Sequence, residues 1–306
     1  MEFQSLPWRE QKSRILPLAA SLCIDRYGLT LKGIDKGTGE GNDFSYRVDA
    51  WEGRYHIRVC SPAYPYNLVR STLWYPSQLK RALGLIVPET IPGVDGEPIQ
   101  RIAADSAYGG YHCCVMYRWI EACLLAELRE DPRFPSMMEN LGAQLARMHS
   151  HSQQEDLPEW FTLLERGTSA LDQWLNRLKT EPVQELDPDF DSHEHHTVGQ
   201  LIAWAEELRA WMVERGEGPD QFGIIHGDFN CDNLLFQDTE PCVIDFTPLC
   251  YGYFDMDLVK ALDFGVPPKN HSDFLSGYTS IRSLPDDFED GLRILQRTRA
   301  SVPNWF

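Results

Sequence analysis

The chain has 306 residues, of which 42% are hydrophobic, and a formal net charge of −18. A chain of this length can bury a sizeable core, and we expect it to fold as two lobes. The negative charge argues against a nucleic-acid partner, because a phosphate backbone is bound through Lys and Arg. No stretch of about 18 unbroken apolar residues is present, so we expect no membrane span.

The cysteines and the N-terminal residues favour a cytoplasmic location. The eight cysteines are scattered without a Cys-x-x-Cys spacing, which is typical of free thiols in a reducing compartment. Residues 1–11 contain charges and a proline but no apolar segment of the kind found in signal peptides. The acidity is compatible with a cationic small molecule drawn to an acidic cleft, although keeping the protein soluble is the simpler explanation.

A glycine-rich turn is predicted near the N-terminus, after an expected helix. Apolar residues at helical spacing predict that helix over Ser13–Tyr27. The following segment, Lys36–Asp43, contains Gly37, Gly39 and Gly41 and precedes a predicted strand. A glycine-rich turn between strands lets backbone N–H groups approach a phosphate closely, but an ordinary turn has the same composition.

Two strands and a helix are expected in the next part of the chain. Residues Tyr55–Val59 alternate as a strand should, and they include Arg58. The pattern over Ser71–Leu83 predicts a helix that Pro76 interrupts, since proline removes a backbone donor. Residues Tyr111–Met116 predict the last strand of this part.

The middle of the chain is expected to be helical, with one strongly acidic segment. Amphipathic patterns predict helices over Asn140–His149, where we interpret His149 as structural, and over Leu201–Arg215. Between them, Thr180–His196 is dense in Asp, Glu and His. The histidine spacing fits no recognised metal motif, and a solvated linker explains the segment more simply than a metal site.

The most informative stretch, residues 222–246, reads FGIIHGDFNCDNLLFQDTEPCVIDF. Short apolar runs alternate in it with polar groups, and a polar turn of hairpin length separates the last two runs. The pattern predicts a loop, a strand, a turn and a strand. It places three polar side chains at the ends of apolar segments: Asp228, Asn233 and Asp245.

These three side chains suit phosphoryl transfer from a nucleotide. That reaction needs a carboxylate to orient the acceptor hydroxyl and oxygen ligands to hold Mg²⁺ against the phosphates. A kinase catalytic loop reads His-x-Asp-x-x-x-x-Asn and is followed by an Asp-Phe pair that supplies the main metal ligand. Here His226 and Asp228 lead to Asn233 at the required offset, and Asp245-Phe246 follows. We therefore predict that Asp228 is catalytic and that Asn233 and Asp245 bind the metal.

The wording of these motifs resembles the aminoglycoside phosphotransferase and choline kinase family. The resemblance rests on the stretch 226–235, on Val243–Phe246 and on Asp257-Leu258, and it extends more loosely from about Gly37 to Leu262. It implies a two-lobed, protein-kinase-like α+β fold. The small antiparallel-sheet lobe would comprise residues 1–116, and the mainly helical catalytic and acceptor-binding lobe residues 117–306. It also implies that Asp257 caps the catalytic loop, with Asp255 as the alternative.

The resemblance further implies which residues bind the nucleotide. The loop with Gly37, Gly39 and Gly41 would contact phosphates, and Arg58 would hold the place of the strand-three cation. The junction of the lobes, with Met116 and Arg118, would hold adenine. The family normally pairs the strand-three cation with a Glu on the next helix, yet residues 61–88 contain no acid, and Gln78 is the nearest substitute.

We therefore expect an ATP- and Mg²⁺-dependent phosphotransferase, with GTP as an alternative donor. The acceptor would be a hydroxyl of a small molecule: an aminoglycoside-like antibiotic, an amino alcohol or a homoserine-like metabolite. If it is cationic, the acids of residues 181–194 would help to recruit it. A bacterial Ser/Thr protein kinase of the stress-response type is one alternative. A nucleotide-binding pseudokinase is the other, motivated by the missing helix Glu.

Overall fold

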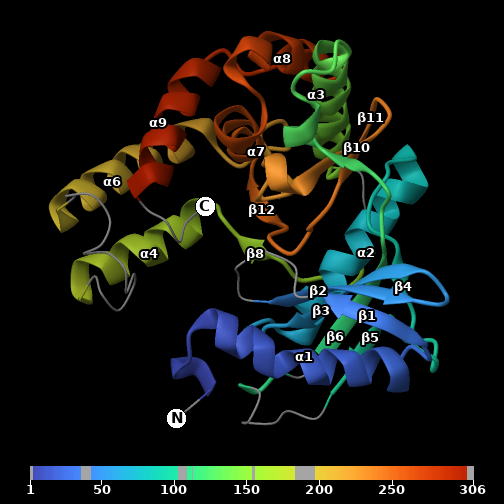
Figure 1. The fold of residues 1–306 in the computed structure, drawn as a ribbon. Helices are drawn as coiled ribbons and strands as arrows, with labels where there is room; N and C mark the ends of the chain where they lie inside the picture. Colours follow the sequence, from blue (N-terminus) through green and yellow to red (C-terminus); the bar gives the residue numbers. More distant parts are fainter. Residues whose placement is uncertain are drawn as a thin grey trace. The chain divides into compact units, whose positions relative to one another are not determined.

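The structure is a computed structural model that describes residues 3–35, 43–102, 109–111, 113–153, 156–182 and 197–301. The chain divides into two compact units (Figure 1). The first comprises Met1–Gln78 and Val87–Glu121, and the second comprises Leu79–Ile86 and Ala122–Phe306. Each unit has its own sheet structure and core.

The first unit is built on an antiparallel sheet with the strand order β1-β2-β3-β6-β4, in which β5 also pairs with β6. Its elements are η1 (Phe3–Ser5), α1 (Trp8–Asp25), β1 (Leu31–Asp35), β2 (Phe44–Ala50), β3 (Arg54–Cys60), α2 (Tyr66–Leu83), β4 (Thr90–Ile91), β5 (Ile99–Arg101) and β6 (Cys113–Arg118). Helix α2 passes into the second unit at Leu79.

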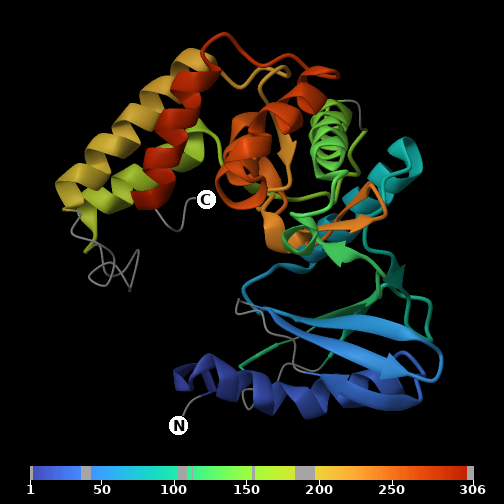
Figure 2. The same cartoon turned by 45° about the horizontal axis from the view of Figure 1, so that its top comes forward.

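The two faces of this sheet are covered by different helices. Cys114 and Met116 of β6 belong to the core shared with α1, whereas Cys113 and Val115 belong to a cluster with Val69 of α2. This is the alternation expected of a strand, because successive side chains point to opposite faces. Both views show α1 running along one side of the sheet (Figures 1 and 2).

Helix α2 differs from the interrupted helix that we predicted. It begins five residues earlier, at Tyr66, and continues through Pro76 to Leu83. Proline costs one backbone hydrogen bond in a helix, but packing can outweigh that cost. Leu68, Val69 and Tyr75 are each at most 5% exposed, so this helix is held by a buried face.

The second unit is mainly helical, with two small sheets ordered β11-β10-β7 and β8-β12-β9. Its strands are β7 (Cys123–Leu124), β8 (Leu164–Glu165), β9 (Phe222–Ile225), β10 (Leu234–Gln237), β11 (Glu240–Val243) and β12 (Cys250–Tyr253). Its helices are η3 (Leu125–Leu128), α3 (Phe134–His151), α4 (Thr168–Thr180), α6 (Val198–Arg215), η5 (Cys231–Asn233), α7 (Phe254–Lys260), the π-helix η6 (Ala261–Gly265), η7 (Pro268–Asn270), α8 (His271–Thr279) and α9 (Phe288–Ser301).

These elements confirm the predicted α+β class, with an antiparallel sheet in the N-terminal part and mainly helices in the C-terminal part. In the described parts of the chain, no helix combines the length and apolar character that crossing a bilayer requires. The acidic segment of residues 183–196, with its histidines, lies outside the described residues.

Helices α3 and α8 lie side by side in both views, and glycine allows their close approach (Figures 1 and 2). A Cβ atom added at Gly142 of α3 would lie 1.9 Å from the carbonyl oxygen of Phe274 in α8. One added at Gly277 of α8 would lie 1.9 Å from the carbonyl oxygen of Glu139 in α3. Non-bonded heavy atoms do not approach one another this closely, so the contact between α3 and α8 requires glycine at both positions.

We predict that Gly142→Ala lowers the free energy of unfolding by about 2 kcal/mol or more, because the two helix backbones must move apart. Chemical denaturation followed by circular dichroism measures this change. Gly199→Ala in α6 is the matched control, since its added Cβ would meet only Thr197 Oγ1, at 3.8 Å. Equal stability of the two variants would contradict a close α3–α8 contact.

Candidate active site

The candidate catalytic residues of the second unit follow the ends of short strands. Strand β9 leads to His226 and Asp228, while β10 and β11 form a hairpin between Asn233 and Asp245. The hairpin register pairs Leu234 with Val243. The predicted loop, strand, turn and strand are therefore present, and the fold brings the three polar residues into one region of this unit.

The buried carboxylate of Asp257 on α7 anchors the catalytic loop. Its Oδ2 accepts from the backbone N–H of His226 and its Oδ1 from that of Gly227, each at 2.8 Å. Two charge-assisted bonds to adjacent peptide groups fix the start of the loop. The expectation that Asp257 caps the loop is confirmed.

Asp257 also bonds to His149 of α3, and the protonation states of the two are determined by their surroundings. His149 Nε2 donates to Asp257 Oδ2 at 3.2 Å, and its Nδ1 accepts from the Tyr278 hydroxyl at 2.9 Å. Burial lowers the pKa of His149 more than the carboxylate raises it. Burial by itself would raise the pKa of Asp257, but its partners, His149 first, hold that pKa below the ordinary value. Asp257 is therefore ionised and His149 neutral. The buried, hydrogen-bonded position of His149 agrees with its interpretation as a structural residue.

The imidazole of His226 connects the catalytic loop to the strand that precedes Asp245. Its Nε2 donates to the carbonyl oxygen of Ile244 at 2.9 Å, and its Nδ1 accepts from the backbone N–H of Asp228 at 3.3 Å. The backbone N–H of Ile244 in turn donates to the carbonyl oxygen of Asn233 at 3.0 Å. Asp228 and Asn233 are thus connected by hydrogen bonds to Ile244, the residue that precedes Asp245.

The carboxylate of Asp228 is held by three side-chain donors. Its Oδ1 accepts from Asn230 Nδ2 at 2.8 Å and from the ammonium of Lys260 at 3.1 Å. Its Oδ2 accepts from Asn233 Nδ2 at 3.0 Å. A carboxylate offers about four lone-pair sites, so the side chain retains capacity for a hydroxyl donor. Sequence reasoning found Asp228 and Asn233 but missed Asn230 and Lys260.

Asp245 occupies an uncommon backbone conformation. Its φ is +56°, in the left-handed region that few side chains other than Asn and Asp adopt. The side chain is exposed, and its Oδ1 accepts from the backbone N–H of Thr247 at 3.2 Å. Strained residues of this kind cluster at functional sites, where the surrounding structure holds them in place.

The donor atoms of Asn233 and Asp245 fit a hard divalent cation. Because Asn233 Nδ2 donates to Asp228, the side-chain carbonyl oxygen of Asn233 is the atom left for a metal. Carboxylate and amide oxygens are the ligands that Mg²⁺ takes in proteins. Within the described ranges, no group of three or more His, Cys, Asp or Glu side chains could hold a metal ion.

In the first unit, Arg58 pairs with an acid that sequence reasoning overlooked. Its Nε lies 3.4 Å from Oδ2 of Asp43, and the two side chains are only 7% and 11% exposed. Asp43 Oδ1 also accepts from the backbone N–H of Ser61 at 2.6 Å. The acid missing from the next helix is therefore replaced by one at the end of the glycine-rich segment, and Gln78 does not have that role.

The remaining expected nucleotide residues differ in their surroundings. Met116 is fully buried inside β6, between Ile57 and Ile91 of its neighbouring strands. Arg118 ends β6, and its backbone N–H donates to the carbonyl oxygen of Glu89 at 2.9 Å. The glycines of the predicted phosphate loop, at positions 37, 39 and 41, lie outside the described residues.

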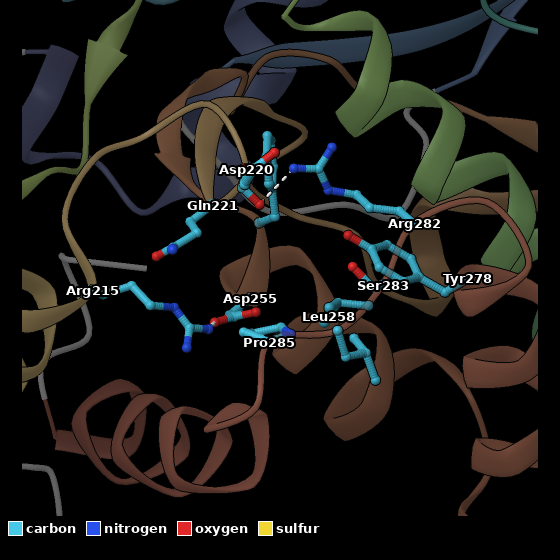
Figure 3. A pocket seen from close by; sticks show the side chains of 11 residues that line it. Arg215, Asp220, Gln221, Asp255, Leu258, Tyr278, Arg282, Ser283 and Pro285 are labelled. Carbon is cyan, nitrogen blue, oxygen red and sulfur yellow. Dashed lines mark hydrogen bonds and ion pairs between the residues drawn. The ribbon is translucent and has the colours of Figure 1, made fainter.

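A cavity in the second unit is lined by charged side chains but is too small for a substrate. Arg215 and Asp255 point toward one another there and form an ion pair, with Arg282 and Gln221 nearby (Figure 3). Burial raises the pKa of Asp255 to about 6, against the attraction of Arg215. The cavity has room for about one water molecule, and we interpret it as part of the scaffold.

The fold and the catalytic loop together are those of a phosphotransferase. A model of the phosphotransferase enzyme family matches residues 36–286. The chain therefore belongs to this family of kinases, whose members transfer a phosphoryl group to an alcohol. Among curated protein sequences, no significant match is found.

Several solved structures share the fold. Amicoumacin kinase hAmiN, in complex with AMP-PNP and Ca²⁺, has a TM-score of 0.74 at 16% identity, with 97% of this chain and 87% of that one covered. A microcompartment-associated aminopropanol kinase has a TM-score of 0.66 at 20% identity, with coverage of 95% and 89%. Choline kinase LicA from Streptococcus pneumoniae has a TM-score of 0.60 at 13% identity, with coverage of 95% and 89%. Family and neighbours support the use of a nucleotide.

We predict that Asp43→Asn lowers the free energy of unfolding by about 3 kcal/mol, because it removes the charge from a nearly buried ion pair. The substitution preserves shape and an oxygen that can accept from Ser61. Asp35→Asn is the matched control in the same sheet, since Asp35 pairs with Arg47 at an exposed site, where the loss is about 1 kcal/mol or less. Denaturant titrations that give equal losses would contradict a structural role for the Arg58–Asp43 pair.

Proposed function

We propose that this protein transfers the γ-phosphoryl group of ATP to the hydroxyl group of a small molecule in a Mg²⁺-dependent reaction. The observation that carries the proposal is the hydrogen-bonded pair of Asp228 and Asn233, which His226 and Asn233 connect to Ile244, the residue next to Asp245. Phosphoryl transfer requires little covalent chemistry from the protein, so positioning and charge do most of the catalysis. A rigidly held carboxylate beside metal ligands meets that requirement.

Each of the three residues has a defined role in the proposal. Asp228 orients the acceptor hydroxyl and accepts its proton. Asp245 and the side-chain carbonyl of Asn233 hold the metal. When bound, Mg²⁺ neutralises charge on the β- and γ-phosphate oxygens. The exposed carboxylate of Asp245 suits a ligand that must reach a cation brought in with the nucleotide.

Residues of the first unit are proposed to bind the nucleotide. Arg58 would contact phosphate oxygens, and its guanidinium forms an ion pair with Asp43. We assign the phosphate loop to Gly37, Gly39 and Gly41 and the adenine site to the segment from Met116 to Arg118. On this assignment residues 1–116 form the nucleotide lobe and residues 117–306 the catalytic and acceptor lobe. ATP is the proposed donor, and GTP is the alternative.

The proposed acceptor is an alcohol that carries an amino or quaternary ammonium group. The named substrates of the neighbouring kinases, amicoumacin, aminopropanol and choline, support this class. The net charge of −18 supports it as well, because an acidic protein attracts cations. We also propose a cytoplasmic location, since ATP is available there and all eight cysteines are free thiols. The Arg58–Asp43 pair supplies an acid partner for the strand-three cation, which supports an active kinase over the pseudokinase alternative.

We predict that Asp228→Ala lowers kcat by about 10²–10⁴-fold, the usual contribution of a positioned base. Affinity for Mg²⁺ and ATP should change little, because Asp228 is not a proposed metal ligand. An ATP-consumption assay over 1-amino-2-propanol, choline, kanamycin and homoserine measures turnover, and calorimetry measures binding. Activity within about tenfold of the wild-type value would contradict the assignment.

We predict that Asp245→Asn weakens Mg²⁺-dependent ATP binding more than Asn233→Ala does, because a carboxylate attracts a dication more strongly than a neutral amide does. Asn tolerates the positive φ at this position, so the substitution tests charge rather than backbone strain. Calorimetry with and without Mg²⁺ measures the difference. The same Mg²⁺ dependence in the wild type and in Asp245→Asn would exclude Asp245 as the main ligand.

A further inference from the structure

We propose that Lys260 is a positioning residue for Asp228, an inference that rests on the proposed function of that carboxylate. The Lys260 ammonium lies 3.1 Å from Asp228 Oδ1, and the two side chains are only 16% and 29% exposed. Exposed ion pairs contribute little because water screens them, but partial burial strengthens a pair. The contact joins residues that are 32 positions apart in the sequence.

The fold delivers Lys260 to the catalytic loop on the same helix face as Asp257. Both residues belong to α7, and Lys260 follows Asp257 by three positions. Residues three apart on a helix are neighbours on its surface. Asp257 holds the backbone of His226 and Gly227, and Lys260 holds the side chain of the next residue, Asp228. Helix α7 therefore fixes both the path of the loop and the direction of its carboxylate.

The π-helix that follows Lys260 packs directly against the loop. It runs from Ala261 to Gly265, and the backbone N–H of Val266 donates to the carbonyl oxygen of Ala261 at 2.7 Å. A Cβ atom added at Gly265 would lie 3.8 Å from the backbone of Cys231 and of Phe229. Isolated π-helical turns are frequent at functional sites. The loop is therefore in contact with the chain that directly follows Lys260, and the Lys260 side chain itself reaches Asp228.

Lys260 completes the set of donors that orients both carboxylate oxygens. With Asn230 it holds Oδ1, while Asn233 holds Oδ2. Only Lys260 brings a full charge, and it comes from outside the catalytic loop. Its loss would remove one of the two donors to Oδ1 and loosen the orientation of the carboxylate toward the acceptor hydroxyl, and a displacement of about 1 Å can cost 10²-fold in rate.

The test compares Lys260→Met, which keeps the length but loses the charge, with Lys260→Arg, which keeps the charge. Turnover is measured with Mg²⁺ and ATP and the best acceptor among 1-amino-2-propanol, choline, kanamycin and homoserine, or with water if none reacts. We expect Lys260→Met to lower kcat about 100-fold, with calorimetric ATP affinity unchanged. Lys260→Arg should recover most of the loss. Lys269→Met, at an exposed lysine on η7, is the matched control and should behave as wild type.

A double-mutant cycle shows whether Lys260→Met lowers kcat through Asp228 or independently of it. In an Asp228→Asn background, Lys260→Met should cause little further loss of kcat. The inference is overturned if Lys260→Met retains near wild-type kcat, if it weakens ATP binding as much as it slows turnover, or if its effect is undiminished in that background.

The same double-mutant cycle can be measured through melting temperatures, which require no turnover. This measurement tests the role of Lys260 independently of the proposed function. Non-additive shifts for Asp228→Asn and Lys260→Met show the coupling without any substrate, because interacting side chains do not contribute independently to stability. A wild-type protein with no turnover would contradict the proposed function alone. Additive shifts would contradict the role of Lys260 alone.

Discussion

The catalytic region depends on one buried charge, the carboxylate of Asp257. It has no exposed surface, and such a group is tolerated only when its hydrogen-bonding capacity is satisfied. The backbone N–H groups of His226 and Gly227 and the imidazole of His149 satisfy it. These donors come from the loop after β9 and from α3, so a single carboxylate on α7 connects three elements. Removing it would leave two buried peptide donors without their partner.

The position of Asp228 follows from that anchor. The loop begins at a fixed point, the imidazole of His226 fixes its spacing from Ile244, and Asn233 returns to the Asp228 carboxylate. The hydrogen bonds of Ile244 lead to Asp245, which has a positive φ. Its backbone is held before the turn by the bonds of Ile244 and after it by the bond from Thr247 to its own side chain. In each unit a basic side chain of the proposed site forms an ion pair with an acidic one. These pairs are Arg58 with Asp43 in the first unit and Lys260 with Asp228 in the second.

The catalytic stretch was predictable because its signals are local. The motif spacing identified Asp228, Asn233 and Asp245 as one set, and apolar runs located the hairpin between the last two. The ion pairs were not predictable in this way. Asp43 lies 15 positions before Arg58 and comes into contact with it across the β2–β3 register, whereas the nearest substitute expected for the missing helix acid was Gln78. Strand register and side-chain packing determine these ion pairs, and the amino-acid composition does not predict them.

Two further features show how packing overrides local preference. Helix α2 continues through Pro76 because one of its faces is buried, although the proline predicted an interruption. Helix α7 continues into a π-helical turn, although nothing in the residues 261–265 marks a change in helix type. The family resemblance identified the loop and its cap, and the contacts that orient the loop required the three-dimensional structure.

Phosphorus NMR on the wild-type protein with Mg²⁺, ATP and an amino alcohol tests the central claim most directly. If the anchored loop performs phosphoryl transfer, the γ-phosphate resonance of ATP is replaced by a phosphomonoester resonance in step with the formation of ADP. Formation of inorganic phosphate alone, or of no product, across amino-alcohol acceptors would contradict the account.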